Sequence, residues 1–257
     1  KDILLKDKSV QSGKTIDKVA ATSKRIYGQT KAPAKKAATT QRSVTTRKKP
    51  EKIIDQDARK LKETLDADVD ALLAKAKRGA IPKNLQPMLA TLVNRPFDDP
   101  DWVYEIKWDG YRTLAFIQKK KVSLLSRNNK SFDKKFYPIF DLLSTWTINV
   151  VLDGEIVALD EKGRSNFNDL QNWRSEADAE LAFYTFDILW YEGKNLMGLP
   201  LTERQAILKA ILPADDDHIR LSTVFNATGT EMFAAAQKMG LEGVMAKRAD
   251  SVYTSGL

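Results

Sequence analysis

Cysteine is absent from the 257-residue sequence, and histidine occurs once, at His218. The lack of cysteine excludes a disulfide framework, a zinc site with cysteine ligands and a cysteine nucleophile. It fits a protein of a reducing compartment, where disulfides do not persist. His218 follows three aspartates in an expected loop, and we expect this histidine to have no chemical role.

Long apolar runs are also missing. No stretch approaches the roughly 18 consecutive apolar residues that a membrane-crossing helix needs, so we expect no membrane partner. The first residues hold no apolar stretch long enough for a secretory signal peptide. Position 1 is a lysine rather than an initiating methionine, and this favours a fragment of a longer protein.

The charge is unevenly distributed along the chain. The formal net charge is +8, of which residues 1–80 carry +11 and the remaining residues −3. A basic arm of this kind indicates contact with a polyanion, and nucleic acid is the commonest one. The alternative is a solvated linker whose charge keeps it in solution, and the charge alone favours neither interpretation.

The chain divides into three expected segments. Residues 1–50 are polar and basic with weak apolar periodicity, which predicts a flexible linker or extension. In residues 51–82, apolar residues recur at helical spacing among charges and predict a helical extension that ends before Pro82. Residues 83–257 alternate between strand and helix patterns, which predicts an α+β domain of antiparallel sheets flanked by helices.

Most of the expected elements in this last segment are short. Strands are predicted over residues 102–106, 111–118, 122–126, 150–152, 156–159, 181–190 and 243–247. Helices are predicted over residues 132–143, 202–212 and 229–239, with Thr202 as a cap. Asp109-Gly110 is expected to join the first two strands as a turn, and Asp153-Gly154-Glu155 to lie at the mouth of a hairpin. Turns are also expected at Lys119–Lys121 and Glu192-Gly193.

One segment places a lysine at a strand end, directly before a tight turn: residues 105–112, EIKWDGYR. A lysine amine must be neutral to attack, and partial burial or a neighbouring cation supplies that form. Lys107 is therefore a candidate nucleophile. The Lys-x-Asp-Gly pattern alone is weak, because about one chance match in twenty chains of this size is expected, and an exposed hairpin lysine is the plain alternative.

Other segments strengthen this interpretation. They supply carboxylates, cations and aromatic rings at Asp153-Gly154-Glu155, Glu242, Arg127, Lys247, Tyr184 and Phe186. Tyr184 and Phe186 alternate along one strand and should share a face. Such a cleft suits a nucleoside triphosphate with Mg²⁺, because carboxylates hold the metal, cations hold phosphates and an aromatic ring stacks on the base. Singly, each residue has a plain alternative as a surface charge or a core aromatic.

Together and in this order, the segments resemble the covalent nucleotidyltransferases, which comprise DNA ligases, RNA ligases and capping enzymes. The runs PMLATL at 87–92 and FDDPDW at 97–102, followed by the Lys107 motif, are similar to bacterial ATP-dependent DNA ligases of the ligase D type, which serve non-homologous end joining. The resemblance covers about residues 85–257. It implies a nucleotidyltransferase core with an ATP-grasp-like fold, an adenylation domain over residues 83–257.

The resemblance also implies a role for each matching residue. Lys107 matches the catalytic lysine that becomes adenylated. Nucleotide contacts are implied for Glu105 at the adenine edge, Arg112 near the ribose and nick phosphate, Arg127 at a phosphate, Glu155 near the ribose, Phe186 stacked on adenine, and Lys247. Glu155 and Glu242 match the carboxylates associated with the metal.

The implied reaction has three steps. The lysine attacks the α-phosphate of ATP and releases pyrophosphate, AMP passes to the 5′-phosphate of a DNA nick, and the 3′-hydroxyl then expels AMP. The implied cofactors are ATP and Mg²⁺ or Mn²⁺. The implied partners are nicked double-stranded DNA, adjoining polymerase or phosphoesterase domains and end-binding proteins, in the bacterial cytoplasm at the nucleoid.

Two other functions are kept as alternatives. An RNA ligase or a capping-type nucleotidyltransferase shares the Lys107 motif, although the run over residues 87–102 argues against it. A catalytically incomplete DNA-binding scaffold is favoured by the basic N-terminal third. In the resembled family, a motif with two lysines and then an oligonucleotide-binding barrel follow the segment that matches Ser251 to Leu257. We therefore expect residues 1–257 to ligate poorly or not at all and to self-adenylate weakly.

Overall fold

The computed structural model describes residues 68–161, 163–213 and 216–256. The linker predicted over residues 1–50, and the part of the helical extension over residues 51–67, lie outside the described residues. Residues 68–75 are helical, and Val69, Leu72 and Leu73 pack against the main hydrophobic core.

The larger sheet of the described region has seven strands. These are β1 (Lys77–Arg78), β3 (Tyr111–Gln118), β4 (Lys121–Ser126), β5 (Val150–Leu159), β6 (Glu180–Tyr191), β7 (Lys194–Asn195) and β8 (Ile219–Leu221). They are arranged in the order β1-β7-β6-β5-β3-β4, with β8 beside β6. All pairings are antiparallel except the parallel pairing of β6 with β8. The predicted α+β class with antiparallel sheets is confirmed.

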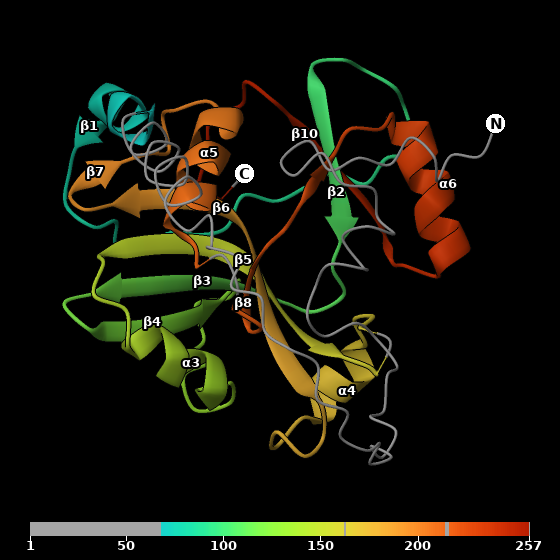
Figure 1. Cartoon of the computed structure of the whole chain (residues 1–257), viewed down its shortest axis with the longest axis horizontal. Helices are drawn as coiled ribbons and strands as arrows, with labels where there is room; N and C mark the ends of the chain where they lie inside the picture. The colour runs from blue at the N-terminus through green and yellow to red at the C-terminus, as the bar shows by residue number, and fades with distance from the viewer. Residues whose placement is uncertain (1–67, 162, 214–215, 257) are drawn as a thin grey trace, which may run out of the picture.

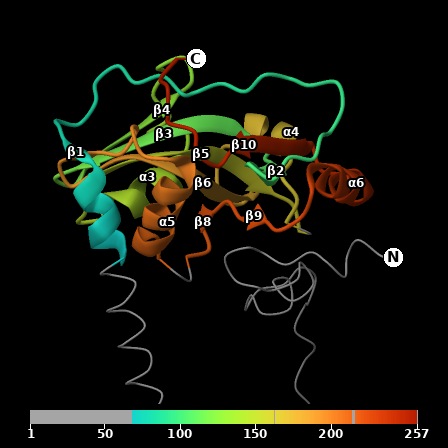
Figure 2. The same cartoon turned by 90° about the horizontal axis from the view of Figure 1, so that it is seen from above.

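Both faces of this sheet are covered. Its central strands β5 and β6 are nearly continuous apolar runs, so their side chains need to be shielded from water on both sides of the sheet. Helices α3 (Tyr137–Ser144) and α5 (Leu201–Ile211) lie on one face, while the chain that leads into β2 passes over the other (Figure 2). A short helix, α4 (Phe167–Asn172), follows β5. Buried side chains of β5 are divided among three cores, with Leu152 in the main core, Val151 in a smaller one that also contains Tyr253, and Val157 in a third that contains Tyr184.

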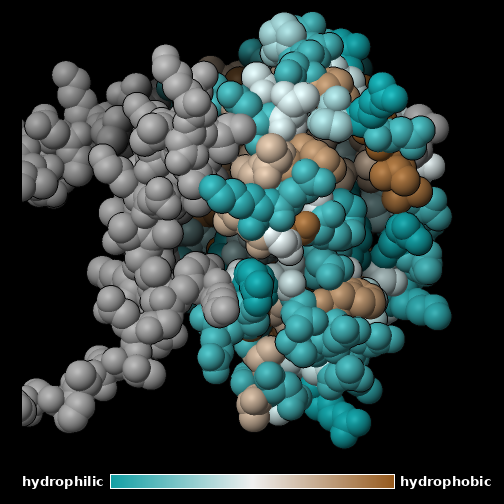
Figure 3. Space-filling view, turned by 90° about the vertical axis from the view of Figure 1, so that its right-hand side faces the viewer, coloured by the Kyte–Doolittle hydropathy of each residue, from teal (hydrophilic) through white to brown (hydrophobic). Residues whose placement is uncertain are grey.

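The smaller sheet has three strands in the order β10-β2-β9. They are β2 (Trp102–Lys107), β9 (Val224–Phe225) and β10 (Gly243–Arg248), and helix α6 (Gly229–Met239) packs beside them (Figure 1). A capping box between Thr228 and Glu231 begins α6, and Gly240 ends it in the left-handed conformation. The face of the molecule on the α6 side is mainly hydrophilic, with small separate apolar areas (Figure 3).

After the long connection of residues 79–101 from β1 to β2, the chain passes between the two sheets at three short crossings, which we define as residues 108–110, residues 222–223 and residues 249–253. The first joins β2 to β3, and the second joins β8 to β9. The third returns from β10 to the larger sheet, where the backbone N–H of Tyr253 donates to the carbonyl of Met197 over 2.8 Å. Residues from all three crossings meet at the site described below.

The expectation that Asp109-Gly110 joins two strands as a turn holds only in part, since β2 and β3 belong to different sheets. β2 pairs with β9 and β10, whereas β3 pairs with β4 and β5. The turn packs against β5 so closely that a Cβ on Gly110 would lie 2.2 Å from the carbonyl oxygen of Ile156. Glycine is required there for a crossing rather than for a hairpin.

Two further local predictions are wrong. Residues 150–159 form one continuous strand, β5, so Asp153-Gly154-Glu155 lies inside a strand and not at a hairpin mouth. Gly154 allows this because a Cβ there would lie 2.5 Å from the carbonyl oxygen of Tyr184 on β6. Thr202 does not cap α5, which begins at Leu201 after Pro200 without a side-chain cap.

The tight turns at the other strand ends are confirmed. Lys119 and Lys120 have φ of 50° and 63° between β3 and β4, and Glu192 and Gly193 have φ of 40° and 82° between β6 and β7. Two successive residues of positive φ match the right-handed twist of a hairpin.

Candidate active site

Lys107 is the last residue of β2, at the start of the first crossing. It lies opposite Gly243 in the ladder of β2 and β10, and the glycine leaves room for the aliphatic part of the lysine side chain. The Lys107 ammonium forms an ion pair with Glu242, the residue before β10. The side chain is 43% exposed, so a solute can reach the amine. The neighbour is thus a carboxylate, not the cation that would favour a neutral amine.

Glu105, on the same strand, is buried with a side-chain exposure of 2%. Its carboxylate accepts hydrogen bonds from Lys247 Nζ at 2.9 Å, Gln205 Nε2 at 2.8 Å and Ser222 Oγ at 3.1 Å. A buried carboxylate needs such partners, because its charge is otherwise costly to remove from water. The predicted contact of Glu105 with an adenine edge therefore competes with three contacts inside the protein.

Trp108 connects the first crossing to the second. Its indole Nε1 donates to Ser222 Oγ over 3.1 Å, and Ser222 in turn donates to Glu105. The Trp108 ring stacks on Tyr184 of β6, with centroids 3.5 Å apart and an interplanar angle of 14°. The residue after the candidate nucleophile is thereby fixed to both sheets, and this limits the movement of the Lys107 backbone.

Arg112, near the start of β3, forms a bidentate ion pair with Asp153 of β5. Its Nε lies 2.6 Å from Oδ1, and its Nη2 lies 2.7 Å from Oδ2. Burial alone would lower the pKa of Arg112, but Asp153 raises it above its ordinary value. The Tyr253 hydroxyl also donates to Asp153, over 2.6 Å. Burial and the Asp153 charge raise the pKa of Tyr253, so this phenol remains a donor.

Glu155 lies opposite Arg112 in the ladder of β3 and β5. Burial raises the pKa of the half-buried Glu155 to about 8, and the negative charge of Asp153 adds to this rise. The positive charges of Arg112 and Lys107 oppose it by lowering the pKa. Glu155 is therefore electrostatically coupled to the candidate nucleophile. A carboxyl with a pKa of about 8 keeps its proton near neutral pH.

Phe186 lies at a bulge in the pairing of β5 with β6. The ladder moves from Gly154 opposite Thr185 to Asp153 opposite Asp187, so Phe186 is the extra residue. Bulges turn a side chain away from its regular direction and are frequent beside active sites. The Arg112 guanidinium and the Lys247 ammonium each lie 4.3 Å from the ring centroid. Adenine can stack only on a ring face that neither cation covers.

Arg127 follows β4 and is exposed. The preceding residue, Ser126, pairs with Thr113, next to Arg112. The structure therefore brings the predicted residues into two groups joined by Phe186, with Lys107, Glu242, Glu105 and Lys247 on the smaller sheet and Arg112, Glu155 and Phe186 on the larger one. Arg127 lies at the border of the second group.

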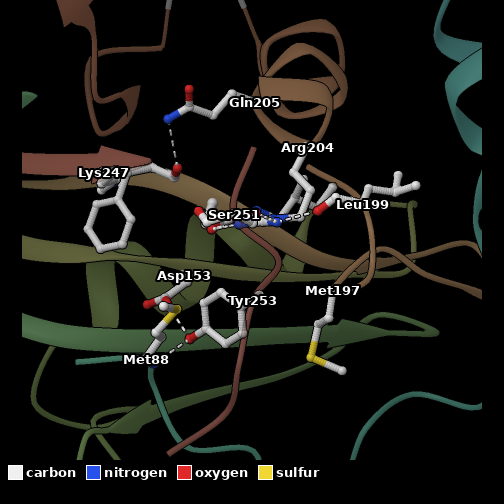
Figure 4. Close-up of polar contacts among 12 residues, drawn as sticks. Met88, Asp153, Met197, Leu199, Arg204, Gln205, Lys247, Ser251 and Tyr253 are labelled. Carbon is white, nitrogen blue, oxygen red and sulfur yellow. Dashed lines mark hydrogen bonds and ion pairs between the residues drawn. The ribbon is translucent and has the colours of Figure 1, made fainter. Parts of the chain in front are cut away.

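Several residues of this site were not found from the sequence. Gln205 lies on α5, 100 residues from its partner Glu105, and no local pattern marks it. No local pattern marks Ser222 or Tyr253 either. Arg204 forms a buried bidentate ion pair with Asp187, the residue after Phe186. Its Nε lies 2.7 Å from Oδ1 and its Nη2 lies 2.8 Å from Oδ2. Figure 4 shows Arg204 between Leu199 and Ser251. A basic residue on the apolar face of α5 was the only available signal for this pair.

The carboxylates fit a metal that is held jointly with phosphate. Mg²⁺ typically binds through one or two protein carboxylates, water and substrate phosphates. Glu155 and Glu242 are two carboxylates that each interact with Lys107. Within the described residues, no group of three or more His, Cys, Asp or Glu side chains could hold a metal ion by itself. The donor set therefore suits a cation that arrives with a triphosphate.

Comparison with known proteins identifies the family. Residues 87–257 match the model of the ATP dependent DNA ligase domain, which is more than half of the chain. The chain belongs to this ATP-dependent DNA ligase family. The predicted resemblance is confirmed, and the domain is an ATP-dependent DNA ligase adenylation domain of the ligase D type. The roles of individual residues stay predictions.

Similar proteins include two multifunctional non-homologous end joining proteins named LigD. The one from Pseudomonas aeruginosa is 38% identical over 183 residues, which are 68% of this chain and 21% of that protein. The one from Mycolicibacterium smegmatis is 35% identical over 185 residues, which are 71% of this chain and 24% of that protein. The chain thus spans less than a quarter of the length of these two relatives.

A solved structure shows the same fold. A mycobacterial DNA ligase D complexed with ATP and MES superposes with a TM-score of 0.62 at 34% identity, over 67% of this chain and 57% of that chain. The predicted nucleotidyltransferase-type fold of the ligase domain is confirmed. Among the described residues, no helix is long and apolar enough to span a membrane.

Proposed function

We propose that this ligase domain forms a covalent lysyl-AMP at Lys107 and transfers the AMP to the 5′-phosphate of a nick in double-stranded DNA. The observation that carries the proposal is the position of Lys107. Its accessible amine lies at a crossing between two sheets, in an ion pair with Glu242 and in electrostatic contact with Glu155. Glu242 is an acceptor for the proton of this amine, and the two glutamates can hold a metal that arrives with a triphosphate.

The first step forms a nitrogen–phosphorus bond. The ammonium in the ion pair is the resting form, and the Glu242 carboxylate is the adjacent acceptor for its proton. The Lys107 nitrogen then bonds to the α-phosphorus of ATP. The bond from this phosphorus to its bridging oxygen breaks, and pyrophosphate leaves with the electron pair.

Cationic side chains stabilise the charge that moves onto the phosphates. Arg112, Arg127 and Lys247 are the candidates on this chain. We assign Phe186 and Glu105 to the base and Glu155 to the ribose. When bound, Mg²⁺ or Mn²⁺ would be held by Glu155 and Glu242 and would neutralise phosphate charge.

The later steps regenerate the lysine. An oxygen of the DNA 5′-phosphate attacks the AMP phosphorus, the nitrogen–phosphorus bond breaks, and the Lys107 nitrogen takes back a proton. The 3′-hydroxyl oxygen then bonds to the 5′-phosphorus and gives up its proton to solvent, while the bond from this phosphorus to its bridging oxygen breaks and AMP leaves. Strand joining in bacterial non-homologous end joining is the process we propose, because the relatives carry that name.

The organisation around this chemistry is part of the proposal. We propose residues 83–257 as the adenylation domain and the basic residues 1–50 as a DNA-contacting extension, since their charge is opposite to that of DNA. The partners are adjoining polymerase or phosphoesterase domains and end-binding proteins, in the bacterial cytoplasm at the nucleoid. The multifunctional LigD relatives support such an arrangement.

The test is intact mass spectrometry of the chain after incubation with ATP and Mg²⁺. We expect an added mass of one AMP in the wild type, no adduct in Lys107→Ala, and an unchanged adduct in Lys238→Ala, whose lysine is an exposed residue of helix α6. An adduct that persists in Lys107→Ala would remove Lys107 as the nucleophile. An adduct formed with GTP but not ATP would favour a capping-type enzyme, and the absence of any adduct from the folded wild type would contradict self-adenylation.

The DNA step has its own readout. Adenylated protein freed of ATP is mixed with a nicked DNA duplex that carries a 5′-phosphate, and with the same duplex that lacks it. We expect AMP to move only to the phosphorylated nick. Equal transfer to a nicked RNA duplex would favour an RNA ligase, and salt-dependent DNA binding without any transfer would favour the scaffold function.

A further inference from the structure

Asp153 is a fully buried carboxylate at the centre of the larger sheet. Its Oδ1 accepts a hydrogen bond from Arg112 Nε at 2.6 Å. Its Oδ2 accepts two, from Arg112 Nη2 at 2.7 Å and from the Tyr253 hydroxyl at 2.6 Å. Three donors on its two oxygens hold this buried carboxylate in one orientation, and the Tyr253 hydroxyl is the one donor among them that does not come from Arg112.

Tyr253 is itself held from three sides. Tyr253 is 6% exposed and belongs to the smaller core, together with Leu114 and Trp190. Its backbone N–H donates to Met197, and its hydroxyl accepts from the backbone N–H of Met88 at 2.9 Å. Because Met88 occupies the hydroxyl as an acceptor, the phenolic hydrogen is directed to Asp153 (Figure 4). These three hydrogen bonds hold the third crossing, residues 249–253, against the larger sheet next to the site.

This arrangement fixes the position of the Arg112 guanidinium, because Asp153 holds it by two hydrogen bonds. Within the described chain, its Nε donates to Asp153, and its Nη2 donates to Asp153 and to the Met88 carbonyl. Nη1 is therefore the donor available to a substrate. The guanidinium lies 4.3 Å from the ring centroid of Phe186. Two predicted nucleotide contacts therefore share one support, and any rotation of Asp153 displaces the guanidinium from the ring.

We infer that Tyr253 is a positioning residue for the adenylation reaction, because its hydroxyl fixes Asp153, which holds the Arg112 guanidinium over Phe186. This inference rests on the proposed function, in which Arg112 and Phe186 contact the nucleotide. Tyr253 does not touch the substrate. It acts on the binding of ATP through two other side chains.

Tyr253→Phe removes the hydroxyl and keeps the buried ring. Tyr137→Phe is the matched control, because its hydroxyl also bonds a carboxylate, that of Glu176, on a surface away from the site. Self-adenylation is measured as a function of ATP concentration. For Tyr253→Phe, we expect the half-saturating ATP concentration to rise about tenfold, as for one hydrogen bond to a charged group, with little change in the maximal rate. Tyr137→Phe should behave as wild type.

A second comparison separates positioning from a general loss of structure. In an Arg112→Lys background the bidentate pair with Asp153 is already lost, so Tyr253→Phe should have almost no further effect on the half-saturating concentration. A merely structural role would lower the melting temperature of both Tyr253→Phe proteins and leave the half-saturating concentration unchanged. That result, or an equal effect in both backgrounds, would overturn the inference.

The outcome also distinguishes the inference from the proposed function. If the wild type adenylates and Tyr253→Phe matches it at every ATP concentration, the inference fails and the proposed function stands. If the folded wild type neither binds ATP in a calorimetric titration nor forms an adduct, both fail together.

Discussion

Lys247 Nζ lies 2.9 Å from Oε1 of Glu105, although the sequence predicts a nucleotide contact for each of these residues. The two side chains are 20% and 2% exposed, so the pair is largely shielded from water. A cation that balances a buried carboxylate has a structural function in addition to any contact with phosphate. Removal of Lys247 should therefore affect stability as well as catalysis.

Lys247→Ala is expected to lower the free energy of unfolding by about 2–3 kcal/mol, because it leaves the Glu105 charge buried without its cation. Urea denaturation measures this loss. Glu105→Gln in the same chain removes the unpaired charge and should recover part of the stability. Lys121→Ala, which truncates an exposed lysine on β4, is the control. Equal stabilities of Lys247→Ala and Lys121→Ala would show that the ion pair contributes nothing.

Glu242→Gln is expected to separate catalysis from stability. The pair with Lys107 is substantially exposed on both sides, at 43% and 35%, and such pairs contribute below about 1 kcal/mol. The loss of a carboxylate that accepts the lysine proton should slow self-adenylation about a hundredfold. Rapid-quench adenylation and thermal melting are the two measurements.

Asp250→Asn is the matched control for that prediction, since Asp250 forms an exposed ion pair with Arg248 just beyond the candidate site residues of β10. It should leave the adenylation rate unchanged. A Glu242→Gln protein that adenylates as fast as Asp250→Asn would remove Glu242 from the proton transfer.

The pKa of Glu155 predicts how stability depends on pH. Burial raises this pKa from 4.5 to about 8, so between these values the folded chain keeps a proton that the unfolded chain has lost. The folded state then binds more protons, and the contribution of Glu155 to the free energy of unfolding falls as pH rises from about 4.5 to about 8. Above this range it no longer changes.

Glu155→Gln isolates that contribution. Melting temperatures of the wild type and of Glu155→Gln, measured in EDTA between pH 5 and pH 9, are subtracted at each pH. We expect the wild type to lose stability relative to the variant as pH rises to about 8, the value to which burial raises the Glu155 pKa. A difference that stays constant with pH would mean that Glu155 is not buried in the native protein.

The sequence predicted what depends on neighbours along the chain. The sequence predicts the strand that ends near Lys107, the turn at Lys119 and Lys120, and a helix over the residues of α6, and each of these depends on residues within a few positions. The family resemblance added residue roles that local patterns could not supply. Both sources place Lys107 and Glu242 in the same site, and the structure pairs them.

The contacts that shape the site depend on distant parts of the chain. Glu105 is separated from Gln205 by 100 residues, and Asp153 from Tyr253 by the same number. Nothing in the local sequence reveals that β2 and β3 belong to different sheets, because a two-residue Asp-Gly turn has the same composition whether it closes a hairpin or crosses between sheets. Only the packing of the turn on Ile156 decides between them.

Gly110 offers a direct test of that crossing. A Cβ at this position would lie 2.2 Å from the Ile156 carbonyl oxygen and 2.9 Å from Val157 Cγ1, and backbone cannot move aside cheaply in a central strand. Gly110→Ala should therefore lower the free energy of unfolding by about 1–3 kcal/mol and displace Lys107, three residues away, so that adenylation slows. Gly198→Ala is the control, because a Cβ there meets nothing within 4 Å. If Asp109-Gly110 instead closed an open hairpin between β2 and β3, an alanine at Gly110 would find space, and the two variants would be equally stable in urea.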